Sequence, residues 1–202
     1  MQERARKTRA RILEAATKLF SARGFNGATI DEIAALADVN KQRIYAYFGS
    51  KNRLFEAALL DVFERIELFS RETLAQAARH PEKMTAIVIQ GFLKAHAAQP
   101  DLWRLLAWAN LEGSLCTEAL NQARCQENDH LRLLYEQAVA DGHLRPVNFE
   151  TWLFTLLAVT YFRFSNELTL SHTLNRVCSM PKIEKELTEG LNSLFAAENP
   201  VE

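Results

Sequence analysis

Residues 29–51 alternate apolar and polar positions at the period of a helix, in two short stretches with a break between them. In the first stretch the apolar residues follow the i, i+3, i+4, i+7 spacing of one buried stripe: Ile30, Ile33, Ala34 and Ala37. Thr29 precedes this stretch and Asn40 precedes the second, and both residue types cap helices through a side-chain oxygen. Asp38 stands at the break, and Asp tolerates the left-handed backbone of a sharp turn. The pattern predicts two short helices joined by a tight turn.

The second predicted helix turns polar side chains outward, because Ile44 and Phe48 occupy its inward face. Its outer face carries Lys41, Gln42, Arg43, Tyr45 and Tyr47. Arg and Lys reach guanine acceptors in the DNA major groove, and Gln pairs with adenine. A helix, a turn and a polar second helix are the parts of a helix-turn-helix motif. The alternative for this pattern alone is a helical hairpin whose outer face is solvated.

A basic helix precedes this pair. Its inward stripe and the stop at Gly24 predict a helix over residues 4–23, with Phe25 filling the core of the three helices. Ser50 is expected to cap the following helix, which places Lys51 at a helix N-terminus suited to phosphate. The leading end of the first helix carries Arg4, Arg6, Lys7, Arg9 and Arg11. Such a run is either a flexible arm or, beside a helix-turn-helix, a contact to phosphates or a minor groove.

Charge is divided unevenly along the 202 residues, although the formal net charge is only −1. Residues 1–53 hold 11 Lys and Arg against 5 Asp and Glu, whereas residues 54–202 hold 13 against 20. A basic N-terminal quarter on an acidic body is expected when one end of a protein meets phosphates. This asymmetry argues against a helical carrier or sensor protein that does not read DNA.

Composition narrows the class further. Hydrophobic residues make up 48% of the chain, with 5 Pro and 7 Gly, which favours a packed helical fold over disorder. The N-terminus does not resemble a signal peptide, and the apolar run over residues 152–162 is too short to span a bilayer. Cys116, Cys125 and Cys178 are scattered, which argues for reduced thiols in a cytoplasm. We therefore expect a cytoplasmic protein with no membrane partner.

Motifs of catalysis and metal binding are missing from the sequence. It contains no G-x-S-x-G, no phosphate-binding loop and no H-E-x-x-H. Its five histidines do not have the spacing of metal ligands. We expect no enzymatic activity, no metal site and no cofactor.

An ordered series of segments lies between residues 8 and 58: residues 12–16, Leu19-Phe20, Gly24-Phe25, residues 28–34, Val39, residues 44–48, Ser50-Lys51 and Leu54-Phe55. This series resembles the TetR-type transcriptional repressors, whose fold is all-α. The family usually has Gly at the turn and Ser or Thr at the cap of the recognition helix. This sequence has Asp38 and Asn40 there, and both are physically competent substitutes.

By position, the resemblance implies two sets of DNA contacts. Contacts to phosphates are implied for Thr29, Tyr45, Tyr47 and Lys51. Contacts to base edges are implied mainly for Asn40, Lys41, Gln42 and Arg43. Tyr45 has an alternative place in the small core, which the residues leave open.

The remaining chain is expected to form a larger helical domain. We place an N-terminal three-helix, helix-turn-helix DNA-binding domain at residues 1–50 and a ligand-binding and dimerisation domain at residues 51–202. Apolar periodicity and breaks predict a polar loop at residues 169–181 and helices near residues 54–78, 84–99, 101–112, 117–140, 149–168 and 182–197.

The last two predicted helices carry apolar stripes that bear on the oligomeric state. Their apolar residues include Trp152, Leu153, Leu156, Ile183, Leu187, Leu191 and Leu194. They are either buried within one subunit or paired with their copies across a two-fold axis in a four-helix bundle. The resemblance favours the homodimer, which would space two recognition helices one DNA turn, about 34–36 Å, apart.

The resemblance also implies a pocket for a small apolar or amphipathic effector among the middle helices. Candidate lining residues are Phe92, His96, Trp103, Trp108, Asn110, Tyr161, Phe162 and Arg163. For each aromatic residue the alternative is ordinary core packing.

The sequence therefore predicts a regulator that binds a palindromic double-stranded DNA operator as a dimer and is released by an effector. Repression rather than activation is implied by the resemblance. The alternative is an architectural or partner-recruiting DNA-binding regulator with no small-molecule ligand.

Overall fold

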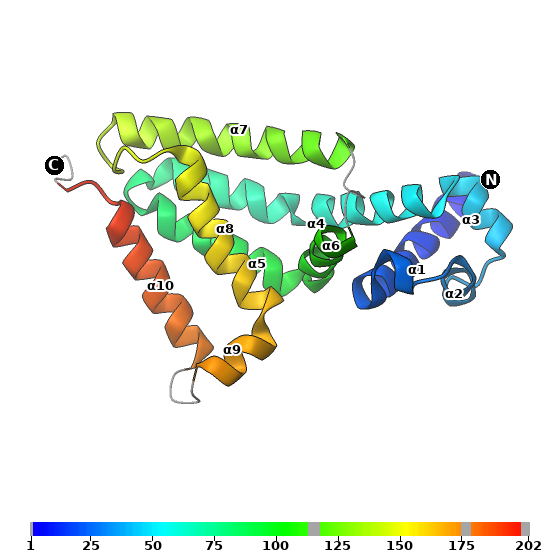
Figure 1. Ribbon diagram of the computed structural model, residues 1–202. Coiled ribbons are helices and arrows are strands. Elements are labelled where there is room, and N and C mark those ends of the chain that lie inside the picture. The colour runs from blue at the N-terminus through cyan, green and yellow to red at the C-terminus, as the bar shows by residue number, and fades with distance from the viewer. Residues whose placement is uncertain (1, 113–117, 175–178, 199–202) are drawn as a thin grey trace. The chain divides into compact units, whose positions relative to one another are not determined.

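The computed structural model describes residues 2–112, 118–174 and 179–198, which form helices and short connections (Figure 1). This confirms the all-α prediction. The helices in this part of the chain are α1 (Gln2–Gly27), α2 (Ile30–Leu36), α3 (Lys41–Phe48), α4 (Lys51–Arg79), the 3-10 turn η1 (Pro81–Lys83), α5 (Met84–Ala98), α6 (Pro100–Glu112), α7 (Glu118–Ala140), α8 (Phe149–Ser165), α9 (Glu167–Thr173) and α10 (Met180–Phe195). Within these residues no helix is long and apolar enough to cross a membrane.

The prediction of a polar loop at residues 169–181 is wrong at both ends. Helix α8 stops at Ser165, because Asn166 leaves the helical region with φ −124° and ψ 29°. Helix α9 then occupies Glu167–Thr173, and α10 starts at Met180, with Pro181 in its first turn. A seven-residue helix with no buried residue has no apolar stripe, so periodicity gives no signal for it.

Packing divides the chain into two compact units. Residues 1–65 and 99–123 form unit 1, and residues 66–98 and 124–202 form unit 2. Helix α4 is continuous through the first division. The boundary at residue 50 between a DNA-binding domain and a ligand-binding and dimerisation domain concerns function, not packing, and it stays a prediction.

Unit 1 contains the three N-terminal helices. Helix α1 packs against α2 and α6, and α2 packs against α3. Most of the predicted inward residues lie in its core, with side chains that are almost fully covered: Ile12, Ala16, Phe20, Ile33, Ile44 and Phe48. Ile30, which was also predicted to face inward, is half-buried. Phe25 packs against this core: its ring contacts the Phe55 ring edge-on, with centroids 5.6 Å apart. Phe20 meets the same Phe55 ring at 5.0 Å.

The α1 helix is interrupted at Gly24, which has φ 74° and ψ 179°. This agrees with the predicted stop, although helical backbone resumes as far as Gly27. A Cβ atom on Gly24 would lie 2.6 Å from Trp108 Cε3 and 2.7 Å from Glu112 Oε1. Glycine is required here both for the positive φ and for the close approach of α6.

Unit 2 is built around α5, which packs against α8 and α10. Trp152 is fully buried, and its indole Nε1 donates to Thr85 Oγ1 at 3.1 Å. Tyr135 packs its ring on Trp152, with centroids 4.7 Å apart, and its hydroxyl donates to the Val147 carbonyl at 2.8 Å. Both polar tips therefore have partners inside an apolar core, as buried aromatic residues require.

We expect Gly24→Ala to destabilise the protein more than Gly49→Ala. Both glycines have positive φ outside the left-handed α region, where backbone strain in any other residue costs on the order of 1–3 kcal/mol. A Cβ on Gly49 would meet only the Arg53 side chain at 3.6 Å, so that variant measures the backbone cost alone. At Gly24 the overlap with Trp108 adds about 1–3 kcal/mol. Free energies of unfolding from urea titrations would measure the difference, and equal losses would contradict the close approach.

Candidate nucleic-acid interface

Helix α2 begins with a capping box between Thr29 and Glu32. The Thr29 hydroxyl accepts from Glu32 N at 3.2 Å, and Thr29 N donates to Glu32 Oε2 at 3.0 Å. The Thr29 hydroxyl also donates to Glu32 Oε2, and Arg23 donates to the Glu32 carboxylate at 2.6 Å. The hydrogen bonds from Thr29, followed by that from Arg23, hold the pKa of Glu32 below its ordinary value. The predicted cap at Thr29 is confirmed.

The turn and the second cap also have the predicted geometry. Asp38 has φ 52°, and Val39 N donates to the Ala34 carbonyl at 3.0 Å, which closes the end of α2. Asn40 caps α3, because its Oδ1 accepts from Arg43 N at 2.9 Å. Because Oδ1 of Asn40 is used in the cap, its amide nitrogen Nδ2 is the side-chain atom that can donate to another partner.

The outer face of α3 is exposed, and its inner face is covered. Ile44 is 1% and Phe48 7% exposed. Tyr45 is 47% exposed, which places it on the surface and removes its alternative role in the small core. Lys41, Gln42 and Arg43 are also exposed, and Tyr47 is half-buried. Lys41, Gln42, Arg43, Tyr45 and Tyr47 therefore all lie on α3, with side chains that are exposed or half-buried.

Lys51 begins α4 and lies beside the connection that precedes α2. Its Nζ is 4.5 Å from the centre of the Phe25 ring. The predicted Ser50 cap is present, because Ser50 Oγ accepts from Arg53 N at 3.2 Å. A cation at the N-terminus of a helix whose amides point outward suits an anionic partner.

Ion pairs on this surface engage several of the cations. Lys41 Nζ lies 3.3 Å from Asp31 Oδ1, which links α3 to α2. Arg11 Nη2 donates to the Asp38 carbonyl at 3.3 Å, which ties α1 to the turn. The side chains are exposed, and such pairs contribute about 0–1 kcal/mol. Phosphate groups can therefore displace them at low cost.

The connection between α1 and α2 is held at its start by a side-chain acceptor that the sequence did not predict. Glu112, the last residue of α6, accepts from Phe25 N at 2.8 Å and from Asn26 N at 3.1 Å. These two amides follow the break at Gly24, where helical partners are lost. Glu112 is 87 residues from Phe25 in sequence, so no local pattern identifies it.

The candidate effector residues are distributed between the two units. Trp103, Trp108 and Asn110 lie on α6 in unit 1, where Trp108 sits against Gly24. The others belong to unit 2: Phe92, His96, Tyr161, Phe162 and Arg163. The aromatic group around His96 consists of the rings of His96, Tyr161 and Phe164, and the Arg163 guanidinium lies over the Phe164 ring.

His96 is the polar centre of the unit 2 group. It is 7% exposed, and its ring stacks on Phe164 with centroids 5.6 Å apart. The Phe92 carbonyl lies 2.7 Å from Nδ1 and can only accept, so Nδ1 carries the proton. Burial lowers the pKa of His96, although the bond to Phe92 opposes this shift. The ring is then neutral near pH 7, and Nε2 is a hydrogen-bond acceptor.

Arg163 and Phe162 have different surroundings. Arg163 Nε donates to Glu184 Oε1 at 2.6 Å, which joins α8 to α10. Phe162 is 48% exposed, so its ring is not part of the core.

The candidate dimer residues divide into covered and exposed sets. Trp152, Leu153 and Leu156 are at most 7% exposed within one chain, so neighbours in the same subunit already cover them. Ile183 and Leu191 are half-buried. The apolar side chains that one chain leaves exposed on α8 and α10 include Phe154, Leu157, Leu187 and Leu194.

In the described part of the chain no group of three His, Cys, Asp or Glu residues could hold a metal ion. Cys116 and Cys178 lie outside the described residues, as does the side chain of Cys125.

A helix-turn-helix with a capped, polar second helix defines a DNA-binding class of protein, and the family comparisons agree. Residues 12–58 match the family model of tetR-family bacterial regulatory proteins, and residues 66–191 match the tetracyclin repressor-like C-terminal domain. The chain belongs to the TetR family of transcriptional regulators.

The chain is similar to named repressors over most of its length. It is 32% identical to the HTH-type transcriptional repressor NicS of Pseudomonas putida, over 85% of this chain and 82% of that protein. It is 39% identical to the HTH-type transcriptional repressor SCO4008 of Streptomyces coelicolor, over 69% of this chain and 67% of the other. A TetR family regulator from Marinobacter aquaeolei shares the fold, with a TM-score of 0.73 over 98% of this chain and 100% of that one at 16% identity.

We expect the stability of the protein to fall as the pH drops below about 6.5, in part because of His96. Burial lowers the pKa of His96 in the folded state, so the unfolded chain binds the proton more readily in this range. Stability is therefore retained above the ordinary His pKa and lost as the pH falls through the folded value. His96→Gln, which does not titrate, should weaken the pH dependence of the free energy of unfolding measured in urea below about pH 6.5. An unchanged pH profile for His96→Gln would contradict the assignment.

Proposed function

We propose that this protein represses transcription by binding a palindromic operator as a homodimer, and that a small molecule releases it. The observation that carries the proposal is helix α3, which is capped at Asn40, anchored by Ile44 and Phe48, and polar along its exposed face. The related proteins NicS and SCO4008 are named repressors, which favours repression over activation.

Base reading is assigned to the first turn of α3. Gln42 and Arg43 are exposed and have the donor and acceptor groups that pair with adenine and guanine edges. Asn40 contributes its amide nitrogen, since Oδ1 is engaged in the cap. Lys41 reaches a base only by leaving Asp31, so its share of the reading is smaller than that of Arg43.

Phosphate contacts are assigned to residues around the reading helix. Lys51 lies at the N-terminus of α4, and Tyr45 and Tyr47 carry hydroxyl donors on α3. The Thr29 hydroxyl already donates to Glu32, so a phosphate contact there would replace that bond. These contacts orient the protein on the duplex without selecting its sequence.

The dimer is assigned to the exposed apolar face of α8 and α10, defined by Phe154, Leu157, Leu187 and Leu194. Both helices pack against α5, and the Arg163–Glu184 pair joins them within one subunit. Leu187 and Leu194 are separated by two helical turns, so they follow one line on α10. Pairing this face with its copy removes exposed apolar surface from water, as a two-fold interface requires.

The effector is assigned to the aromatic group around His96 in unit 2. Its rings favour an apolar or amphipathic molecule, and the neutral His96 offers Nε2 as an acceptor to a hydroxyl or N–H donor. Such a ligand releases DNA only if it binds the two conformations of the dimer with different affinity.

The first experiment is selection of bound sequences from random duplex DNA with the purified protein at two salt concentrations. We expect an enriched palindrome whose half-sites are about 10–10.5 base pairs apart or a multiple of that spacing. On the selected site, Arg43→Ala should cost about 1–3 kcal/mol and relax one position of the sequence. Lys51→Ala should weaken all duplexes about equally and lower the salt slope by about one for each subunit of the dimer. Equal losses of Arg43→Ala on selected and random DNA would remove it from the base readers.

Leu187→Glu and Leu194→Glu should each weaken the dimer at least about tenfold, because a carboxylate would enter an apolar contact. Leu133→Glu on α7 is the matched control, since Leu133 is 66% exposed and lies outside the proposed face. Sedimentation equilibrium would measure the dissociation constants of the wild type and of the three variants. A wild-type monomer, or variants that dimerise as the wild type does, would refute the assigned interface.

A further inference from the structure

A charged cleft of about 930 Å³ opens between the start of α1 and the turn that leads into α3. Its charged lining consists of Glu3, Arg4, Lys7, Arg11, Asp38 and Arg43. Four cations face two carboxylates, so the cleft has a net positive charge. Arg43, which belongs to the base-reading turn of α3, lines the same cleft as the basic end of α1.

The α1 wall of the cleft is a row of cations with helical spacing. Arg4, Lys7 and Arg11 follow one another at i, i+3 and i+7, which places them on one face of the helix. This row belongs to α1, which is helical from Gln2, and the Thr8 hydroxyl donates to the Arg4 carbonyl at 2.9 Å within this helix. A flexible basic arm, which the sequence left open, does not describe these residues.

Arg11 fixes this row beside the helix-turn-helix. Its Nη2 donates to the Asp38 carbonyl at 3.3 Å, and its Nη1 lies 3.8 Å from Asp38 Oδ2. Asp38 is the left-handed residue of the turn, so the anchor is at the point where α2 ends. A duplex that contacts the exposed side of α3 is thereby brought alongside the start of α1.

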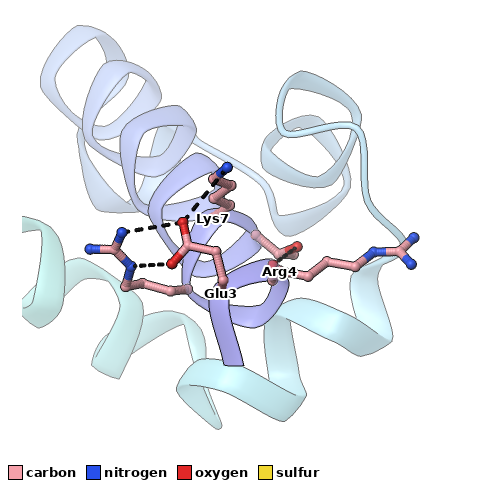
Figure 2. Close-up of polar contacts among 5 residues, drawn as sticks. Glu3, Arg4 and Lys7 are labelled. Atoms are coloured by element: carbon pink, nitrogen blue, oxygen red, sulfur yellow. Dashed lines mark hydrogen bonds and ion pairs between the residues drawn. The ribbon is translucent and has the colours of Figure 1, made fainter. Parts of the chain in front are cut away.

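Glu3 reduces the positive charge of the cleft. Its carboxylate lies 3.6 Å from Lys7 Nζ and accepts from Arg6 Nε at 3.2 Å. Figure 2 shows these contacts, and it shows the Arg4 side chain extending away from Glu3. Arg4 therefore keeps its charge available to the cleft, whereas Lys7 is partly neutralised.

We propose that this cleft binds the phosphate backbone of the duplex that flanks the bases read by α3, and that Glu3 limits its affinity. The inference rests on the proposed function, because it requires α3 to lie in the major groove. Guanidinium and ammonium groups in a row match a chain of phosphates, and each phosphate neutralised releases counterions from the DNA. The contact is independent of base sequence, and it extends the bound duplex beyond the recognition helix.

The test uses the full-length protein and two duplexes of the selected site, one trimmed to its half-sites and one with flanking base pairs. Affinity is measured as a function of salt for the wild type, Arg4→Gln and Glu3→Gln. Lys18→Gln is the matched control, since Lys18 is exposed on α1 and lies about 21 Å along the helix from Arg4.

We expect Arg4→Gln to weaken binding to the long duplex about three- to tenfold at 0.1 M salt and to reduce the salt slope by about one for each subunit of the dimer. The short duplex should be bound as by the wild type. Glu3→Gln should bind the long duplex about two- to threefold more tightly, because Lys7 is released to the phosphates. A gain in affinity cannot result from partial unfolding, and a gain that is confined to the long duplex cannot result from the added positive charge alone.

Three outcomes would overturn the inference. The first is an unchanged salt slope for Arg4→Gln on the long duplex, and the second is weaker or unchanged binding by Glu3→Gln. The third is an equal loss of affinity for the short and the long duplex with Arg4→Gln, which would place its contact within the half-sites. If the wild type selects no DNA sequence, the proposed function fails; if it selects a palindrome and the variants have no effect, only the cleft assignment fails.

Discussion

The carboxylate of Glu112 holds the junction on which the DNA-binding unit depends. Where α1 breaks at Gly24, the amides of Phe25 and Asn26 lose helical partners, and Glu112 accepts from both. This contact directs Phe25 into the aromatic core, where its ring also supports the ammonium group of Lys51. One carboxylate from α6 thereby fixes both the entry to α2 and the surroundings of a residue that we assign to phosphate.

The local features of the DNA-binding unit could be predicted, because their signals span only a few residues. The caps at Thr29 and Asn40 each involve an amide three residues ahead, and the left-handed turn at Asp38 reflects the preference of one residue type. The role of Glu112 could not be predicted, since its partners are 86 and 87 residues away. A helix cap involves residues that are close together in the sequence, so a local pattern predicts it. An acceptor from a distant helix depends on which helices pack together, which a local pattern does not show.

In unit 2 the sequence predicted the helices better than their faces. Helix α8 is apolar on several sides, so its pattern does not separate the core side, with Trp152 and Leu156, from the exposed side, with Phe154 and Leu157. The candidate effector residues show the same limit, because an aromatic residue of the core and one of a pocket have identical patterns. Trp108 illustrates this, since its indole packs against the backbone at Gly24 in unit 1.

The charge of the N-terminal region is large in the sequence but partly neutralised in the structure. Glu3 lies beside Lys7, and Asp31 lies beside Lys41. Such exposed pairs are weak, so phosphates can displace them, but each displacement subtracts from the gain of binding DNA. Non-specific binding consists almost entirely of phosphate contacts, whereas specific binding adds contacts to base edges. Carboxylates that compete for the cations therefore lower the affinity for random DNA and for an operator by a similar factor, and the discrimination between the two depends on the base-edge contacts of α3.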